Sequence, residues 1–233
     1  MISSTQIAAN LEVIRQRVAQ ACDKTGRNPD EITILGASKG QTVERLRWAW
    51  EAGLRVFGEN RVQEALAKID ALTAEVEWHL IGPLQSNKVK KVVPVFAAVQ
   101  SIDRPKIARA LDREATQSGR PLLGFIEVNL AEEESKHGFL PEQLIQHLPD
   151  LQDLETLEIV GLMAIPPFEA DPQDSRRWFR QLRELRDRVF SQESWSQRPG
   201  YLSMGMSHDY DVAVEEGATH VRVGTSLFGP RGA

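Results

Sequence analysis

Apolar residues recur at two spacings near the start of the chain. Over 5–25 an apolar residue returns every three or four positions with charged residues between, which predicts an amphipathic helix. The next segment, 32–38, is a short apolar run rich in β-branched residues and predicts a buried strand. The apolar positions of the first helix are Ile7, Leu11, Ile14, Val18 and Cys22.

The same unit, a strand followed by a helix, is repeated along the chain. Such alternation implies parallel strands joined by right-handed crossovers. Eight units predict one (β/α)₈ TIM-type barrel over residues 1–233, with an extra N-terminal helix. A doubly wound sheet is the alternative, although no Gly-x-Gly-x-x-Gly follows the first strand. The predicted strands are 32–38, 55–58, 77–82, 97–102, 122–129, 159–164, 201–204 and 220–224. The predicted helices between them are 42–52, 62–72, 87–91, 104–118, 141–147, 174–190 and 207–216.

Composition narrows the class of protein. The net charge of −5 gives no basic surface for nucleic acid, and no apolar run is long enough to span a membrane. The N-terminus lacks the pattern of a signal peptide. Cys22 is the single cysteine, so no internal disulfide can form and a reducing, cytoplasmic setting is expected. The well-charged surface predicts a monomer.

Reactive groups of a (β/α)₈ barrel gather where its strands end. The residues at these predicted ends include no Cys/His cluster at zinc spacing and no run of calcium ligands. The chain also lacks a nucleophile elbow, a Walker loop and a His-Glu-x-x-His helix, which argues against metal catalysis and Ser-His-Asp hydrolysis.

The last two strands lead into loops suited to an anion. One loop reads Ser203-Met204-Gly205-Met206-Ser207, and the other reads Gly224-Thr225-Ser226. Glycines let backbone N–H groups approach a phosphate, and hydroxyls add donors. Loops after strands seven and eight often form the phosphate site of such barrels. The pair of loops therefore predicts a phosphate site.

Two cations accompany this site. Lys39 ends the first predicted strand, and Arg222 lies inside the last one between two valines, so that it faces the barrel interior. A buried guanidinium needs an acceptor, which is either a carboxylate such as Glu127 or Glu59, or a ring nitrogen of a bound ligand. Lysine, phosphate site and inward cation together suggest pyridoxal 5'-phosphate, with the lysine amine joined to its aldehyde as a Schiff base.

Six motifs, in order along the chain, resemble those of a known family. The chain is similar over essentially its whole length to the pyridoxal phosphate homeostasis proteins, the YggS/PROSC family. The resemblance implies a barrel similar to the N-terminal domain of alanine racemase (fold type III of pyridoxal phosphate proteins). The motifs are Gly36–Lys39, Phe57–Glu64, His79–Lys88, Gly161–Met163, Leu202–Asp209 and Val221–Gly229.

The resemblance also implies a role for particular residues. Lys39 would carry the cofactor, Arg222 would meet the pyridine nitrogen, and Asn60 would lie beside the ring. His79 belongs to a motif near the pocket. The residues implied for the phosphate are Ser203, Ser207, Gly224 and Thr225.

The resemblance and the chemistry together predict a carrier. An arginine at the pyridine nitrogen keeps it unprotonated and weakens the ring as an electron sink. In the racemase a second domain and a partner subunit supply a tyrosine base, whereas this chain ends at Ala233, directly after the barrel. Its two tyrosines, Tyr201 and Tyr210, flank the phosphate loop. We therefore expect a non-catalytic protein that binds and buffers pyridoxal phosphate and delivers it, with pyridoxal-phosphate-dependent apoenzymes as candidate partners.

Two alternatives stay open. One is a weak amino-acid racemase with Lys39 as a base, and the other is a phosphosugar enzyme that uses Lys39 as its Schiff-base lysine. Two segments receive no role from the sequence. Glu134–Phe139 is family-like without a physical account, and Trp195–Arg198 matches no pattern.

Overall fold

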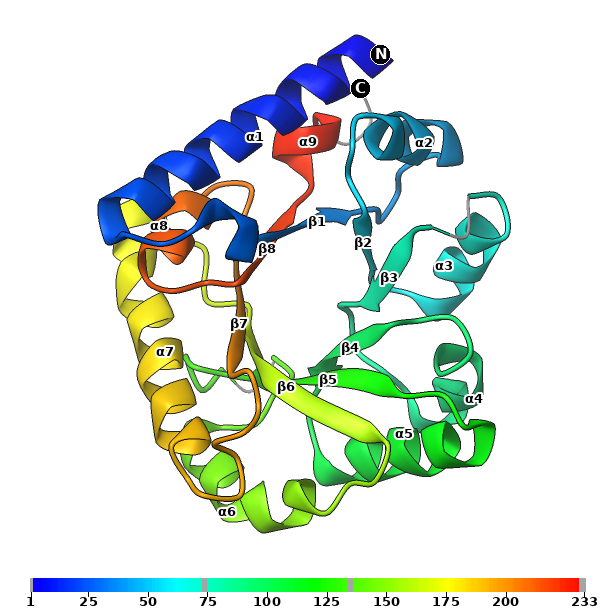
Figure 1. The fold of residues 1–233 in the computed structure, drawn as a ribbon, viewed down its shortest axis with the longest axis vertical. Coiled ribbons are helices and arrows are strands. Elements are labelled where there is room, and N and C mark those ends of the chain that lie inside the picture. The colour runs from blue at the N-terminus through cyan, green and yellow to red at the C-terminus, as the bar shows by residue number, and fades with distance from the viewer. Residues whose placement is uncertain (1, 73–74, 134–135, 231–233) are drawn as a thin grey trace.

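The computed structural model describes residues 2–72, 75–133 and 136–230. Eight parallel strands follow one another around a closed barrel, and β1 pairs with β8 to complete it, with Leu35 opposite Arg222 (Figure 1). The predicted barrel is confirmed, and the open doubly wound sheet is excluded by its closure. The strands are β1 (Thr33–Ala37), β2 (Val56–Glu59), β3 (Glu77–Leu80), β4 (Ala98–Ile102), β5 (Leu122–Val128), β6 (Leu157–Ala164), β7 (Tyr201–Met206) and β8 (His220–Val223).

Helices surround the barrel in Figure 1, and most of the apolar core lies between them and the strands. None of the helices in the described parts of the chain is long and apolar enough to cross a membrane. The helices are α1 (Ser4–Thr25), α2 (Val43–Glu51), α3 (Val62–Ile69), α4 (Val89–Val92), α5 (Pro105–Ser118), α6 (Pro141–Gln152), α7 (Arg176–Phe190), α8 (Tyr210–Glu215) and α9 (Thr225–Phe228). The described residues also include three short 3₁₀ helices, η1 (Pro29–Glu31), η2 (Ser86–Lys88) and η3 (Pro172–Ser175).

The N-terminal helix α1 has clear start and stop signals. The Ser3 hydroxyl accepts a hydrogen bond from the N–H of Gln6 and caps the helix, and Gly26 ends it at φ 68°, a conformation that glycine adopts without strain. Its buried face is the apolar stripe that the sequence predicts, and it packs against α8, α2 and α9.

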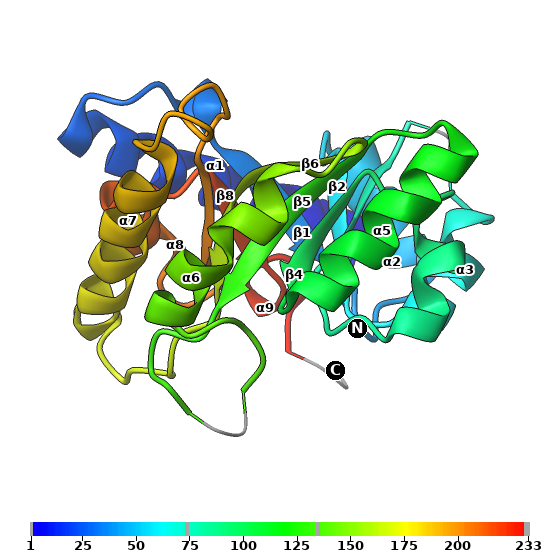
Figure 2. The same ribbon diagram turned by 90° about the horizontal axis from the view of Figure 1, so that it is seen from below.

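The strands share one direction, so their carboxyl ends meet at one end of the barrel. In Figure 2 the strands run towards the lower edge, where the long loop after β5 also lies. The loops that contain the predicted site residues therefore gather at one mouth of the barrel.

Some boundaries differ from the sequence-based ones. The helix predicted over 141–147 continues through Pro149 to Gln152, and β6 begins at Leu157 rather than at position 159. The helix predicted over 207–216 is shorter, because residues 207–209 form the turn that leads into α8. The short helix α9 was not predicted.

The segment Trp195–Arg198 packs on the barrel between α7 and β7. The Trp195 ring is fully buried and lies edge-on to Phe190. The Arg198 guanidinium lies 4.4 Å from the Trp195 ring centroid and donates hydrogen bonds to the carbonyls of Ile159 and Gln152. This segment therefore packs against the outside of the barrel around the buried Trp195 ring.

Candidate functional site

One cavity of about 280 Å³ at the mouth of the barrel brings together most of the predicted site residues. It also has an apolar rim that includes Ile81 and Ile165. The two predicted residues that do not line it, Ser203 and His79, lie deeper in the barrel. The predicted residues that do line it are Lys39, Asn60, Ser207, Arg222, Gly224 and Thr225.

Lys39 follows β1 after one intervening residue, Ser38, and is exposed. Within the described ranges its ammonium makes no hydrogen bond or ion pair, so no such contact has to be broken before it meets a ligand. The backbone on both sides of it is held. The Ser38 carbonyl accepts a hydrogen bond of 2.7 Å from Lys68, and the Gly40 N–H donates one of 2.7 Å to Glu64.

These two contacts belong to a buried ion-pair cluster. Lys68 is 6% exposed, and its ammonium lies between the carboxylates of Glu59, which is fully buried, and Glu64. Glu59 also accepts hydrogen bonds from the Ser38 hydroxyl, at 2.7 Å, and from the Asn60 N–H, at 3.1 Å. A buried charge is tolerated only when it is paired and hydrogen-bonded, and this cluster meets both conditions. It fixes the chain on either side of Lys39 and at Asn60.

The loops after β7 and β8 converge on one oxygen. The Ser207 hydroxyl oxygen accepts hydrogen bonds from the N–H of Gly224, at 2.9 Å, and from the N–H of Ser226, at 3.2 Å. Gly205, at φ 87°, permits the bend before Ser207, and an added Cβ there would lie 2.5 Å from the Ala213 side chain. Two backbone N–H groups thus point at one oxygen, an arrangement that would also suit an oxygen carrying negative charge.

Ser203 lies elsewhere than the sequence suggests. Its side chain is fully buried inside the barrel, where its oxygen accepts a hydrogen bond from Arg222 at 2.6 Å and its hydroxyl donates one to Gln100 at 2.6 Å. The expectation that Ser203 joins Ser207 at the phosphate is not supported by this geometry. Strand alternation accounts for this position, because within β7 successive side chains face opposite sides and Ser203 faces inward.

Arg222 faces the barrel interior, as alternation predicts. Besides its bond to Ser203, its guanidinium donates to the Ala164 carbonyl at 2.8 Å. Neither Glu59 nor Glu127 forms an ion pair with it in the described structure, since Glu59 is paired with Lys68. Burial lowers the pKa of Arg222 to about 10, opposed by the charges of Glu127 and Asp209, so the side chain stays cationic at neutral pH.

Glu127 is a titratable group near this arginine. Burial, together with the charge of Asp103, raises the pKa of its carboxyl to about 7, and the charge of Arg222 opposes this rise. Glu127 on β5 is therefore partly protonated at neutral pH, and it does not line the 280 Å³ cavity.

His79 lies below the cavity floor on β3. It is 2% exposed, and its ring nitrogens lie 2.7 Å from Glu77 Oε1 and 2.8 Å from Gln100 Nε2. The structure thus places His79 in the barrel core rather than at the cavity.

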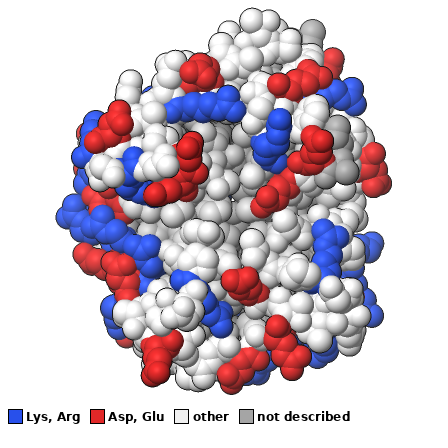
Figure 3. All heavy atoms as spheres, in the orientation of Figure 1, with Lys and Arg blue, Asp and Glu red and all other residues white. Residues whose placement is uncertain are grey.

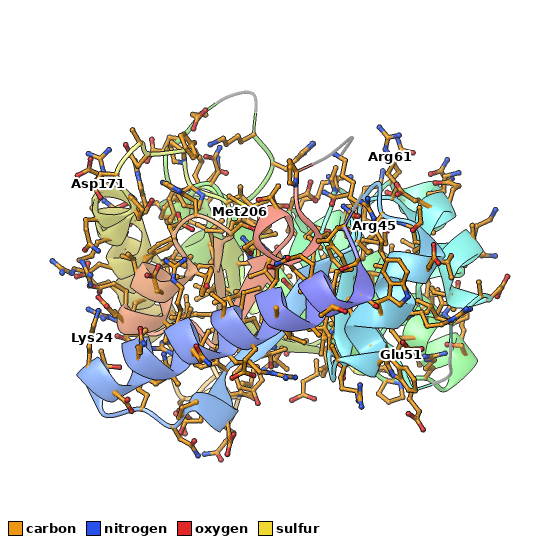
Figure 4. The ribbon with its side chains drawn as sticks, turned by 90° about the horizontal axis from the view of Figure 1, so that it is seen from above. Lys24, Arg45, Glu51, Arg61, Asp171 and Met206 are labelled. Atoms are coloured by element: carbon orange, nitrogen blue, oxygen red, sulfur yellow. The ribbon has the colours of Figure 1, made fainter. Side chains whose placement is uncertain are left out.

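A second, wider cavity of about 650 Å³ adjoins the first and shares Lys39 and Asn60 with it. Arg61, Lys88 and Arg104 give its wall a basic character. In Figure 4, Arg61, after β2, and Met206, at the end of β7, both lie towards the upper edge, at the end of the barrel where the strands finish. Exposed apolar side chains flank the first cavity, where Ile165 and Met206 are among its lining residues.

Several of these residues were missed from the sequence. Lys68 and Glu64 lie four positions apart on a predicted helix, a spacing typical of a surface pair, and only the fold shows that Lys68 also pairs with Glu59. Gln100 is a polar residue within a predicted strand, and nothing in the sequence pattern indicated a role for it. Of Glu134–Phe139, positions 134 and 135 lie outside the described residues, while the Phe139 N–H donates to the Glu127 carbonyl at 2.8 Å.

The chain is similar in sequence to characterised proteins over nearly its whole length. The family described as alanine racemase, N-terminal domain, matches residues 2–232. The pyridoxal phosphate homeostasis protein of Aquifex aeolicus (strain VF5) is 43% identical over 222 residues, which cover 95% of this chain and 96% of that protein. The protein of the same name from Escherichia coli (strain K12) is 37% identical, with 97% of each chain covered.

Solved structures agree with this assignment. PipY of Synechococcus elongatus PCC7942, determined with PLP bound, superposes with a TM-score of 0.85 at 37% identity, covering 96% of this chain and 100% of PipY. Alanine racemase of Clostridium difficile 630 superposes with a TM-score of 0.69 at 14% identity, covering 98% of this chain and 58% of the racemase, and shows the shared fold alone. The resemblance carried by the six sequence motifs is confirmed. The chain belongs to the pyridoxal phosphate homeostasis proteins, within the wider family of the alanine racemase N-terminal domain.

Proposed function

We propose that this protein binds pyridoxal 5'-phosphate in the 280 Å³ cavity and holds it on Lys39 as a Schiff base. The observation that carries the proposal is that the Lys39 side chain lines the same cavity as the Arg222 cation and as Ser207, Gly224 and Thr225 of the two loops that follow β7 and β8. PipY, a relative 37% identical to this chain, is known with PLP bound. When bound, the cofactor supplies an aldehyde that condenses with a primary amine.

The residues of the cavity fit each part of this cofactor. Backbone N–H groups and hydroxyls at Ser207, Gly224 and Thr225 suit the phosphate, and hydrogen bonds to a charged group contribute about 1.5–3 kcal/mol each. Arg222 suits a ring nitrogen that accepts a hydrogen bond, and Asn60 would lie beside the ring. A volume near the lower end of ligand sites suits a small molecule.

Within this proposal the protein is a carrier that buffers pyridoxal phosphate and delivers it to apoenzymes. Arg222 stays cationic at neutral pH and therefore supports an unprotonated ring nitrogen, which weakens carbanion chemistry. Neither tyrosine of the chain can act as a base at the cavity. Tyr210 is buried beneath Arg17, and Tyr201 begins β7 at the other end of the barrel. We also expect a monomer, and a cytoplasmic location in keeping with the free thiol of Cys22.

A weak amino-acid racemase is the second candidate. Glu127, with a pKa of about 7, is a group at the mouth that could exchange protons at neutral pH. Because Glu127 does not line the cavity, we favour the carrier. Incubating the holoprotein with single enantiomers of amino acids tests this directly. Conversion at rates of about 1 s⁻¹ or more, abolished in Glu127→Gln, would establish the racemase instead.

Replacing the hydroxyls of the phosphate site should weaken cofactor binding while Lys39 stays intact. Ser207→Ala with Thr225→Val removes two donors that we assign to the phosphate. We expect the dissociation constant for pyridoxal phosphate, measured by absorbance titration, to rise about 100-fold, which corresponds to about 3 kcal/mol. Thr116→Val, which removes a hydroxyl on the outer helix α5, is the matched control and should leave the constant unchanged. Equal constants in the three proteins would contradict the phosphate assignment.

A further inference from the structure

Arg222 depends on few partners for its orientation. It is 4% exposed, and in the described part of the chain its guanidinium donates to the Ser203 oxygen and the Ala164 carbonyl without forming an ion pair. The Ala164 carbonyl is fixed by the backbone of β6, whereas the Ser203 hydroxyl can rotate. The direction in which the Ser203 proton points therefore decides whether its oxygen is available to Arg222.

That direction is fixed by a chain of hydrogen bonds through the barrel interior. The Ser203 hydroxyl donates to Gln100 Oε1 at 2.6 Å. This orients the Gln100 amide so that its Nε2 donates to His79 Nδ1 at 2.8 Å. A His79 ring that accepts at Nδ1 carries its proton on Nε2, which donates to Glu77 Oε1 at 2.7 Å. Each bond thus sets the donor direction of the next, from Arg222 to Glu77.

This chain of hydrogen bonds crosses the barrel interior from one end to the other. Its members lie on β8, β7, β4 and β3, and Ser203, Gln100 and His79 are each at most 2% exposed. Glu77, at the start of β3, has a side chain 47% exposed. Figure 3 shows the end of the barrel where the strands begin, with charged side chains of both signs around a largely uncharged centre. Interiors of such barrels are usually filled with branched apolar residues, so a polar chain here is costly unless every member is bonded.

We propose that Glu77, His79 and Gln100 are positioning residues that hold Arg222, through Ser203, in the orientation that meets the ring nitrogen of the cofactor. This inference rests on the proposed function, because it takes the cofactor ring to lie at Arg222. None of the three residues touches the cavity.

His220 offers a matched control. It is also buried in the barrel interior, and its ring centroid lies 6.2 Å from that of His79. Its Nδ1 lies 2.9 Å from the hydroxyl of Thr219. Although β7 and β8 pair at Ser203 and His220, the His220 ring makes no hydrogen bond to the side chain of Ser203 or Arg222 within the described residues. A change at His220 thus disturbs packing at a similar depth in the barrel without removing a member of the hydrogen-bond chain.

The test compares His79→Leu with His220→Leu in the holoprotein. We expect cofactor dissociation, followed by transfer to excess apoenzyme, to become about tenfold faster in His79→Leu, which corresponds to about 1.4 kcal/mol. The ¹⁵N NMR signal of ring-labelled pyridoxal phosphate should shift in His79→Leu and stay in place in His220→Leu. Should His79→Leu fail to fold, the half-exposed end of the chain gives a second comparison. Glu77→Ala should speed cofactor dissociation. Glu77→Gln keeps an acceptor for His79 and should dissociate at the wild-type rate.

Three outcomes are decisive. Equal dissociation rates and equal ring-nitrogen signals in the two histidine variants, with the wild type loaded on Lys39, would overturn the inference alone. Failure of the wild type to take up the cofactor would instead contradict the proposed function. The apoprotein then still tests the chain of hydrogen bonds. ¹⁵N NMR of His79 should show a proton on Nε2 and none on Nδ1, and the opposite tautomer would refute the proposed bond directions.

Discussion

Lys68→Met is expected to lower the free energy of unfolding by about 3–5 kcal/mol, because it leaves the Glu59 carboxylate buried without a counter-ion. Glu59 is fully buried and would keep only the Ser38 hydroxyl and the Asn60 N–H as partners. The Ser38 carbonyl, next to Lys39, would lose its bond to the ammonium as well. The variant should therefore also weaken retention of the cofactor.

Urea unfolding of the apoprotein measures this effect. Lys24→Met is the matched control, since Lys24 forms an ion pair with Glu215 on the outside of the barrel and its side chain is 67% exposed. Exposed pairs contribute at most about 1 kcal/mol. If both variants lost the same free energy, the cluster around Glu59 would have no special role.

Lys39→Ala is expected to abolish the covalent attachment of pyridoxal phosphate and leave weak, reversible binding through the phosphate site. The ammonium of Lys39 makes no bond to other described residues, so its removal should change the stability of the fold by less than about 0.5 kcal/mol. The measurement is the fraction of cofactor that stays with the protein after borohydride reduction and denaturation. We expect this fraction to fall to background.

Lys88→Ala serves as the control for this experiment, because Lys88 lines the neighbouring 650 Å³ cavity without lining the smaller one. It should retain the cofactor as the wild type does. Persistent attachment in Lys39→Ala would mean that another amine carries the cofactor.

Much of the fold was predictable because strand and helix alternate with strong local signals. The apolar runs located all eight strands, and Gly26 and Thr42 marked a helix end and a helix start as the structure has them. Helix α6 was underestimated because Pro149 reads as a stop signal, yet the helix continues past it to Gln152. The prediction that the barrel closes rested on the number of strand–helix units rather than on any single residue.

The cavity was largely predictable for a different reason. Parallel strands bring their carboxyl ends together, so residues at those ends, such as Lys39 and Asn60, were expected to meet. Residues that act through the interior were not predictable in this way. Placing Ser203 required the direction of each side chain in β7, and recognising Lys68 required knowing which strand end α3 covers. Both depend on packing between distant segments, which sequence spacing does not report.

The most direct test of the central claim is mass spectrometry of the wild-type protein after loading with pyridoxal phosphate, borohydride reduction and trypsin digestion. The account predicts a single pyridoxyl phosphate group, on the peptide that contains Lys39. Modification of a different lysine, or of none, would contradict it.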